Sequence, residues 1–449
     1  MDAQSTENQI QQQHQAQLAA LLGPNTAAFE TLISQLMSSS NEQRSQAEFA
    51  FNLCKQTDPN SLTLKLAHLL QFSPHLEARA MSAILLRKLL TPSSSDYVWG
   101  RLSLSTQSSI KSTLLACIQF DQTHRNDAKS ISKKICDTIS ELASGVLPDN
   151  GWPELLPFMF QCVSSDSPSL QESALFIFAH LAQLLGDRLL LPYIKELHAV
   201  FLNCLTNSPS PDVRIAALNA LVNFIQCLES SSDRDRFQDL LPAMMRTLTE
   251  ALNSSQEATA QEALELLIEL AGTEPRFLRR QLVDVVGSML QIAEAEQLEE
   301  GTRHLAVEFV ITLAEARERA PGMMRKLPQF ISRLFGILLK MLLDIEDDPA
   351  WHTAQTEDED AGETSNYSVA QECLDRLAIA LGGNTIVPVA SELLPAYLAA
   401  PEWQKHHAAL IALAQIAEGC SKVLLQLLIF YNCCNSKWQT IVPMMGTKS

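Results

Sequence analysis

A run of acidic side chains between positions 344 and 363 is the part of this chain best suited to do chemistry. It contains nine carboxylates and no lysine or arginine, so it carries about half of the net charge of -18. An ionised carboxylate with no cation beside it loses its hydration when buried, so the run is expected to form a solvated loop. Its chemistry is electrostatic: it either attracts a basic partner or serves as a spacer. The nine residues are Asp344, Glu346, Asp347, Asp348, Glu357, Asp358, Glu359, Asp360 and Glu363.

Motifs for catalysis and for metal binding are absent from the sequence. There is no Gly-x-Gly-x-x-Gly, no Gly-x-x-x-x-Gly-Lys, no His-Glu-x-x-His and no Gly-x-Ser-x-Gly. His406 and His407 are adjacent, so on a helix their side chains point about 100° apart and are poorly placed to share a metal. Cys433 and Cys434 form a vicinal pair that we interpret as incidental. We therefore predict that the chain is not an enzyme and binds no metal or cofactor.

The composition predicts a helical protein. The chain has 449 residues, of which 46% are hydrophobic, 6% are aromatic and only 15 are glycine. Such a chain is too long for one compact core, and its few glycines suit helices joined by short connections. The ten cysteines include no Cys-x-x-Cys pair, which is typical of reduced core residues in an intracellular protein.

The acidic balance of the chain limits its partners. A net charge of -18 and an isoelectric point near 5.0 repel nucleic acid and anionic membranes. The longest apolar run, 423–431, is far shorter than the ~20 residues that cross a bilayer. The N-terminus, with seven glutamines in residues 1–17, lacks the features of a secretory signal. Basic proteins are the partners we expect, without membrane insertion.

A repeated pattern of small and apolar residues divides the chain into units. The equivalent positions are spaced by 39, 43, 46, 43, 67 and 36 residues. All but one of these spacings are close to the period of ~40–47 residues that HEAT-type helix pairs show. The positions are Ile135, Ala174, Ala217, Ala263, Ala306, Cys373 and Ala409.

Start signals indicate that each unit holds two helices. Ser210, before Pro211, can cap the second helix of one unit. A proline after leucine often marks the first helix, at Leu156-Pro157, Leu191-Pro192, Leu241-Pro242, Leu327-Pro328 and Leu394-Pro395.

Stacked units bury an apolar face that one pair cannot bury alone. We predict an all-α fold, a right-handed α-solenoid of about nine HEAT-type helix pairs over residues 26–422. Residues 1–25 are expected to be disordered, and residues 423–449 form an atypical tail.

The one long spacing, 67 residues, explains where the acidic run lies. A period near 43 leaves an excess of about 24 residues, and the run falls inside that interval. The insertion is therefore expected to be a loop, residues 344–366, between the two helices of one repeat. Loops of this kind flank the binding face of a solenoid.

Several stretches, taken in order, resemble the karyopherin-beta nuclear transport receptors. They are Cys-Leu-Asp-Arg-Leu-Ala at 373–378, Leu-Gly-Gly-Asn at 381–384 and Pro-Glu-Trp-Gln-Lys-His-His-Ala-Ala-Leu at 401–410. Gln-Ala-Glu at 46–48 and the acidic loop look most like the importin beta-3 branch, plant-like in the glutamine-rich start. The resemblance covers about residues 20–422.

The resemblance implies an import receptor that binds basic cargo signals and Phe-Gly nucleoporins, releases cargo to Ran-GTP, and moves between cytoplasm and nucleus. It implies that Glu372, Asp375 and Trp403 are candidates for cargo contact. It also implies contacts with Ran for six carboxylates of the loop, namely Asp347, Asp348, Glu357, Asp358, Glu359 and Asp360.

The chain departs from this family after Val423. Receptors of the branch continue through further repeats, whereas the sequence here stops following the pattern and ends at Ser449. We therefore expect a truncated form of such a receptor. The alternative is a general HEAT-repeat scaffold without Ran dependence, in which the acidic loop is only a spacer.

Overall fold

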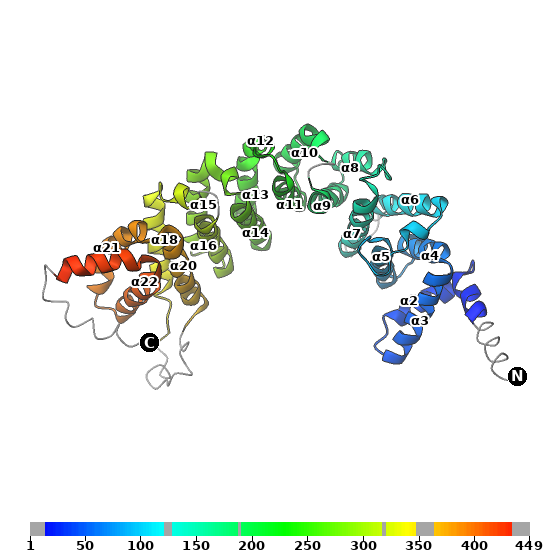
Figure 1. Cartoon of the computed structure of the whole chain (residues 1–449), viewed down its shortest axis with the longest axis horizontal. Coiled ribbons are helices and arrows are strands. Elements are labelled where there is room, and N and C mark those ends of the chain that lie inside the picture. The colour runs from blue at the N-terminus through cyan, green and yellow to red at the C-terminus, as the bar shows by residue number, and fades with distance from the viewer. Residues whose placement is uncertain (1–13, 121–127, 187–189, 317–319, 347–362, 433–449) are drawn as a thin grey trace. The chain divides into compact units, whose positions relative to one another are not determined.

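The computed structural model describes residues 14–120, 128–186, 190–316, 320–346 and 363–432 of the chain (Figure 1). Every named element in these residues is a helix, and an isolated β-bridge joins Ile345 to Glu363. The predicted all-α fold of HEAT-type helix pairs is confirmed. The chain divides into two compact units, residues 1–229 and 230–449, called unit 1 and unit 2.

Unit 1 consists of helix pairs in which the first helix packs on the second. The pairs are α2 (Ala27–Leu36) with α3 (Asn41–Thr57), α4 (Pro59–Phe72) with α5 (Leu76–Leu90), α6 (Leu104–Phe120) with α7 (Ala128–Val146), α8 (Leu155–Val163) with α9 (Pro168–Leu185), and α10 (Ile194–Asn207) with α11 (Pro211–Cys227). The short helices η1 (Trp99–Arg101) and η2 (Leu191–Tyr193) precede α6 and α10. From α5 onward, each second helix packs on the next, so one core runs from pair to pair.

Unit 2 is built in the same way. Its pairs are α13 (Leu241–Asn253) with α14 (Glu257–Thr273), α15 (Leu282–Ala293) with α16 (Glu300–Glu315), α18 (Pro328–Met341) with α20 (Ser365–Leu381), and α21 (Gly383–Leu398) with α22 (Trp403–Asn432). The short helices α12 (Ser231–Asp235) and η3 (Gln238–Leu240) precede the first pair, and η4 (Pro275–Gln281) and α17 (Ala320–Met324) lie between later pairs. The second helices α14, α16, α20 and α22 pack one on the next (Figure 1).

The repeat register predicted from the sequence is confirmed by burial. Each of the seven equivalent positions lies on the second helix of its pair and is at most 2% exposed. The predicted cap is also present, because the Ser210 hydroxyl accepts a hydrogen bond from the backbone N–H of Val213. The small residues at most of these positions let neighbouring second helices approach closely.

Three local features differ from the expectations. Residues 14–22, in the stretch expected to be disordered, are helical, because Leu21 finds a buried position. The start of a first helix at Leu394-Pro395 is wrong: α21 begins at Gly383, and Pro395 lies in its last turn. A proline near the end of a helix removes one backbone hydrogen bond without ending the segment before it. Finally, α22 continues past Val423 as far as Asn432.

The described helices and cysteines give two further observations. None of the helices in the described ranges is long and apolar enough to cross a membrane. Eight of the ten cysteines lie in these ranges, and all eight are free thiols, seven of them buried. Cys433 and Cys434 lie outside the described residues. The described cysteines are core residues, as expected.

Gly419 of α22 provides a test of the close packing between second helices. A Cβ atom at this position would lie 2.4 Å from the carbonyl carbon of Ala378 on α20. We predict that Gly419→Ala lowers the free energy of unfolding by about 1–3 kcal/mol, because the backbone of α20 must shift. Urea unfolding of the full chain measures this change.

Gly336 on α18 is the matched control, because no described atom lies within 4 Å of a Cβ placed there. Gly336→Ala is expected to leave stability unchanged or to raise it by up to about 1 kcal/mol through helix propensity. Equal stability of Gly419→Ala and the wild type would contradict the close approach.

Candidate functional site

Unit 2 presents exposed and half-buried carboxylates on the solvent-facing sides of three successive second helices. Their spacings of three, four or seven residues place them on one side of each helix. We call this surface the acidic face. Its members are Glu262, Glu265 and Glu269 on α14, Glu308 and Glu315 on α16, and Glu372 and Asp375 on α20.

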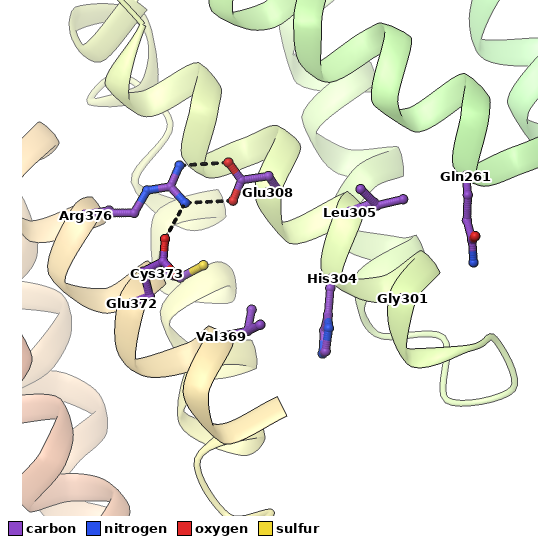
Figure 2. Close-up of a pocket in the computed structure, with 9 residues that line it drawn as sticks. All are labelled: Gln261, Gly301, His304, Leu305, Glu308, Val369, Glu372, Cys373 and Arg376. Atoms are coloured by element: carbon purple, nitrogen blue, oxygen red, sulfur yellow. Dashed lines mark hydrogen bonds and ion pairs between the residues drawn. The ribbon is translucent and has the colours of Figure 1, made fainter. Parts of the chain in front are cut away.

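A shallow pocket of about 320 Å³ lies within the acidic face, between α14, α16 and α20 (Figure 2). This volume is at the lower end of the range of roughly 300–1,000 Å³ for ligand pockets. The lining residues are Gln261 of α14, Gly301, His304, Leu305 and Glu308 of α16, and Val369, Glu372, Cys373 and Arg376 of α20.

Arg376 is the one permanent cation among the lining residues. Glu308 and Glu372 bind it, as Figure 2 shows, and Glu315 of α16 is the third carboxylate that binds it. The two terminal nitrogens of Arg376 lie 2.8 Å from the two oxygens of Glu308, and its Nε and Nη2 lie 2.9 and 2.7 Å from those of Glu315. Glu372 accepts a longer hydrogen bond of 3.3 Å. The bonds to Glu315 and Glu308 raise the pKa of Arg376 above its usual range. One positive charge against three negative charges leaves this cluster acidic.

The edge of the pocket toward α14 is held by a second set of polar contacts. Glu257 accepts hydrogen bonds from the Thr302 hydroxyl at 2.7 Å and from the backbone N–H of Glu299 at 3.0 Å. Gln261 donates to Thr302 at 3.0 Å. Thr302 is fully buried, so these bonds satisfy a hydroxyl that would otherwise destabilise the fold. They fix the beginning of α16 against α14.

The two ends of the acidic loop meet beside the pocket. The β-bridge between Ile345 and Glu363 closes the loop, and the Thr364 hydroxyl donates to the backbone oxygen of Asp344 at 2.6 Å. Asn366, at the start of α20, donates to the Asp344 carboxylate at 2.8 Å. The six predicted Ran-contacting carboxylates, Asp347, Asp348, Glu357, Asp358, Glu359 and Asp360, lie outside the described residues.

Asn366 connects the base of the loop to α16. Its Nδ2 also donates to Glu300 at 3.1 Å, and its Oδ1 lies 2.6 Å from Nε2 of the pocket residue His304. Asn366 is only 7% exposed, so these contacts compensate the cost of burying its amide group. Sequence reasoning missed this residue, because its partners lie on two other segments, α16 and the base of the loop.

The predicted cargo residues are only partly brought together. Glu372 lines the pocket and its side chain is 70% exposed, whereas Asp375 lies one turn further along α20 and is half-buried. Trp403 begins α22 and lies outside the pocket lining. The residue is 37% exposed, and its ring packs edge-on against that of His407, with ring centroids 6.3 Å apart. Trp403 is therefore a partly exposed aromatic residue whose ring is held by His407, on the helix that packs on α20.

The pocket has no nucleophile or metal site among its described residues. Burial raises the pKa of Cys373 to about 12, so its thiol keeps its proton near neutral pH. No group of three or more potential metal ligands occurs in the described part of the chain. What the arrangement can do is attract and hold cationic groups.

Comparison with known proteins identifies relatives of one kind. The family model described as "IPO5-like, TPR repeats" matches residues 127–288, and the one described as "Importin repeat" matches residues 295–388. Importin subunit beta-3 of Saccharomyces cerevisiae is 28% identical over 405 residues, which cover 88% of this chain and 36% of that protein. The chain thus spans little more than a third of the length of this relative.

Solved structures of Kap121p have the same fold. The structure bound to RanGTP has a TM-score of 0.73 and 26% identity, and it matches 88% of this chain and 36% of that one. The structure bound to Pho4p has a TM-score of 0.76 and 26% identity, over 90% of this chain and 38% of that one. The structure bound to Nup53p has a TM-score of 0.75, also at 26% identity, over 89% and 37%.

His407 gives a pH test of the aromatic cluster that supports Trp403. Burial lowers the pKa of His407 below its ordinary value of about 6.5. Tyr367, whose pKa burial raises to about 12, keeps its proton and can donate to Nε2 of neutral His407 at 2.8 Å. The neutral ring is therefore favoured in the folded state. Its stabilising effect is complete above the ordinary pKa and is lost as the pH falls through the lower folded value.

We predict that the melting temperature of the wild type falls between about pH 7 and pH 5, and that His407→Gln loses part of this fall. Thermal unfolding across this pH range measures both. His406→Gln, at the exposed neighbouring position, is the control and should behave like the wild type. An identical pH dependence in all three proteins would show that His407 does not contribute.

Proposed function

Because the chain belongs to the importin (karyopherin-beta) family, we propose that it acts in nuclear import by binding Ran-GTP and basic segments of cargo proteins. It spans 36% of the first relative, so the proposal concerns the surfaces that this part of a receptor carries. Cytoplasm and nucleus are the proposed locations.

The acidic face is the observation that carries the cargo proposal. Carboxylates outnumber cations on the solvent-facing sides of α14, α16 and α20, and such a surface attracts lysine- and arginine-rich segments. Arg376 illustrates the contact: two carboxylates from α16 hold one guanidinium by paired hydrogen bonds. A basic side chain of a cargo would meet the same chemistry at neighbouring positions.

Glu372 and Asp375 are the cargo contacts that we favour. Glu308 and Glu315 already hold Arg376 at 2.7–2.9 Å, so an incoming cation competes with an internal one there. Glu372 makes only the 3.3 Å bond and is largely exposed, which leaves it able to accept from a partner. Trp403, on the next second helix, adds an aromatic surface for the aliphatic part of a lysine or for a cation–π contact.

The relative structure bound to RanGTP supports the proposed Ran contact. The ends of the acidic loop are tied to α16 and α20 through Asn366, so the loop leaves the fold next to the acidic face. We propose that its carboxylates contact a basic surface of Ran. The relative structure bound to Nup53p similarly supports a nucleoporin contact, including contact with Phe-Gly nucleoporins.

Neutralising the loop tests the Ran proposal. The variant Glu357→Gln, Asp358→Asn, Glu359→Gln and Asp360→Asn removes four adjacent charges. We predict that it binds Ran-GTP about tenfold more weakly, with less dependence on salt, because long-range attraction is lost. Surface plasmon resonance with Ran loaded with GTP or GDP measures the effect, and the wild type should prefer Ran-GTP.

The matched control removes four exposed carboxylates of unit 1, by Asp149→Asn, Glu154→Gln, Asp166→Asn and Glu196→Gln. It carries the same net charge as the loop variant and should bind Ran-GTP like the wild type. Equal binding of GTP- and GDP-loaded Ran, or none to either, would instead favour a general scaffold in which the loop is a spacer.

A second experiment tests the acidic face with a lysine-rich peptide. Glu372→Gln combined with Asp375→Asn should weaken binding about threefold to tenfold, chiefly through faster dissociation. The control pair is Asp284→Asn with Glu392→Gln, two exposed carboxylates on the first helices α15 and α21. Fluorescence anisotropy measures affinity for both double variants. A similar loss in the two would mean that net charge alone, rather than this face, attracts the peptide.

A further inference from the structure

Unit 2 also carries a groove of the opposite charge. It has a volume of about 810 Å³ and lies among α12, η3, η4 and the end of α17, with no lining residue in common with the pocket of the acidic face. We call it the basic groove. Five of its lining residues are cationic: Arg234, Arg276, Arg279, Arg280 and Lys326. Two are acidic, Asp235 and Glu274.

The fold turns the arginines of η4 toward this groove. Phe277 and Leu278 of the segment are at most 3% exposed, so they anchor it to the core. A 3₁₀ helix has three residues per turn, which places Arg276 and Arg279 on the same edge. Both arginines and the adjoining Arg280 are exposed. Burial of the apolar residues therefore presents a row of guanidinium groups.

The two acidic residues of the groove neutralise only part of the charge of its five cations. Glu274 pairs with Arg234 at 3.0 Å, and Asp235 accepts a hydrogen bond from Gln238 at 2.7 Å. Within the described part of the chain, the side chains of Arg279, Arg280 and Lys326 have no hydrogen bond or ion pair. Arg325, which directly precedes Lys326, does have partners: its guanidinium donates to the backbone oxygens of Leu381 and Ala380 on α20, at 3.0 and 3.2 Å.

A purely structural role does not explain these charges. Cations stabilise a helix when they lie near its C-terminus, where the helix dipole is negative. Arg279 and Arg280 lie in the last turn of η4, where positive charge is favourable, but also directly before the first turn of α15, where it is unfavourable, so the two dipole effects oppose each other. In a chain with a net charge of -18, unpaired cations gathered at such a place indicate an anionic ligand.

We propose that the basic groove binds an acidic polypeptide segment, rich in Asp and Glu, of a partner protein. Its volume lies within the range of roughly 300–1,000 Å³ of binding pockets, so it admits a short extended segment rather than a folded domain. Nucleic acid fits less well, since the net charge of -18 on the chain repels a long polyanion. Unit 2 would then bind basic segments on its acidic face and an acidic segment in the basic groove.

Fluorescence anisotropy with the full chain tests the proposal. The probe is a labelled peptide of about ten alternating Asp and Glu residues, and its Asn and Gln counterpart is the uncharged reference. The groove variant is Arg279→Gln, Arg280→Gln and Lys326→Gln. We expect the wild type to bind the acidic peptide at least about tenfold more tightly than the reference, and the groove variant to lose this preference.

The matched control is Lys340→Gln, Lys405→Gln and Lys422→Gln, which changes the net charge equally at positions outside the groove. It should bind the acidic peptide within about twofold of the wild type. Three results would overturn the proposal. They are equal weakening in both triple variants, no preference of the wild type for the acidic peptide, and tighter binding of single-stranded DNA of the same charge than of the peptide.

Discussion

The contact between successive second helices is the constraint on which the rest of this structure depends. One helix pair cannot bury its apolar side alone, so within each unit the pairs pack one on the next. The seven equivalent positions, from Ile135 to Ala409, are buried for this reason, and Gly419 leaves no space for a side chain against Ala378. Close packing on one side of each second helix leaves the other side for polar residues. The acidic face of unit 2 is the polar side of three helices that must lie next to one another.

Charge is distributed over unit 2 in a way that suits binding more than stability. Salt bridges at the surface contribute only about 0–1 kcal/mol each, so the carboxylates of the acidic face are not required to hold the helices together. Arg376 is the exception, because its contacts with Glu308 and Glu315 join α20 to α16. Asn366 makes the corresponding connection for the loop, by joining Asp344 to Glu300 and His304. Both residues orient acidic groups while leaving net negative charge at the surface.

The sequence predicted the helix pairs and their register well, because helix length sets the period and the small buried residues mark it. The predicted cap at Ser210 lies directly before the observed start of α11 at Pro211. Local signals were less reliable where tertiary packing decides, as for the helix at 14–22 and for Pro395 inside α21. The site was predicted in its chemistry but not in its geometry. Glu372 and Asp375 were named as candidates from the sequence. The contacts of Arg376 with Glu308 and Glu315, and those of Asn366 with Glu300 and His304, span more than sixty residues of the chain, and only folding reveals them.

The central claim is that basic partners bind on the acidic face, formed by α14, α16 and α20. Hydrogen–deuterium exchange of the full chain, with and without a saturating lysine-rich peptide, tests it most directly, because protection maps contacts onto individual helices. The account predicts slower exchange in peptides covering 257–273, 300–315 and 365–381, with little change in the first helices α15 and α21. Protection confined to the first helices, or no protection in unit 2 while the peptide is bound, would contradict it.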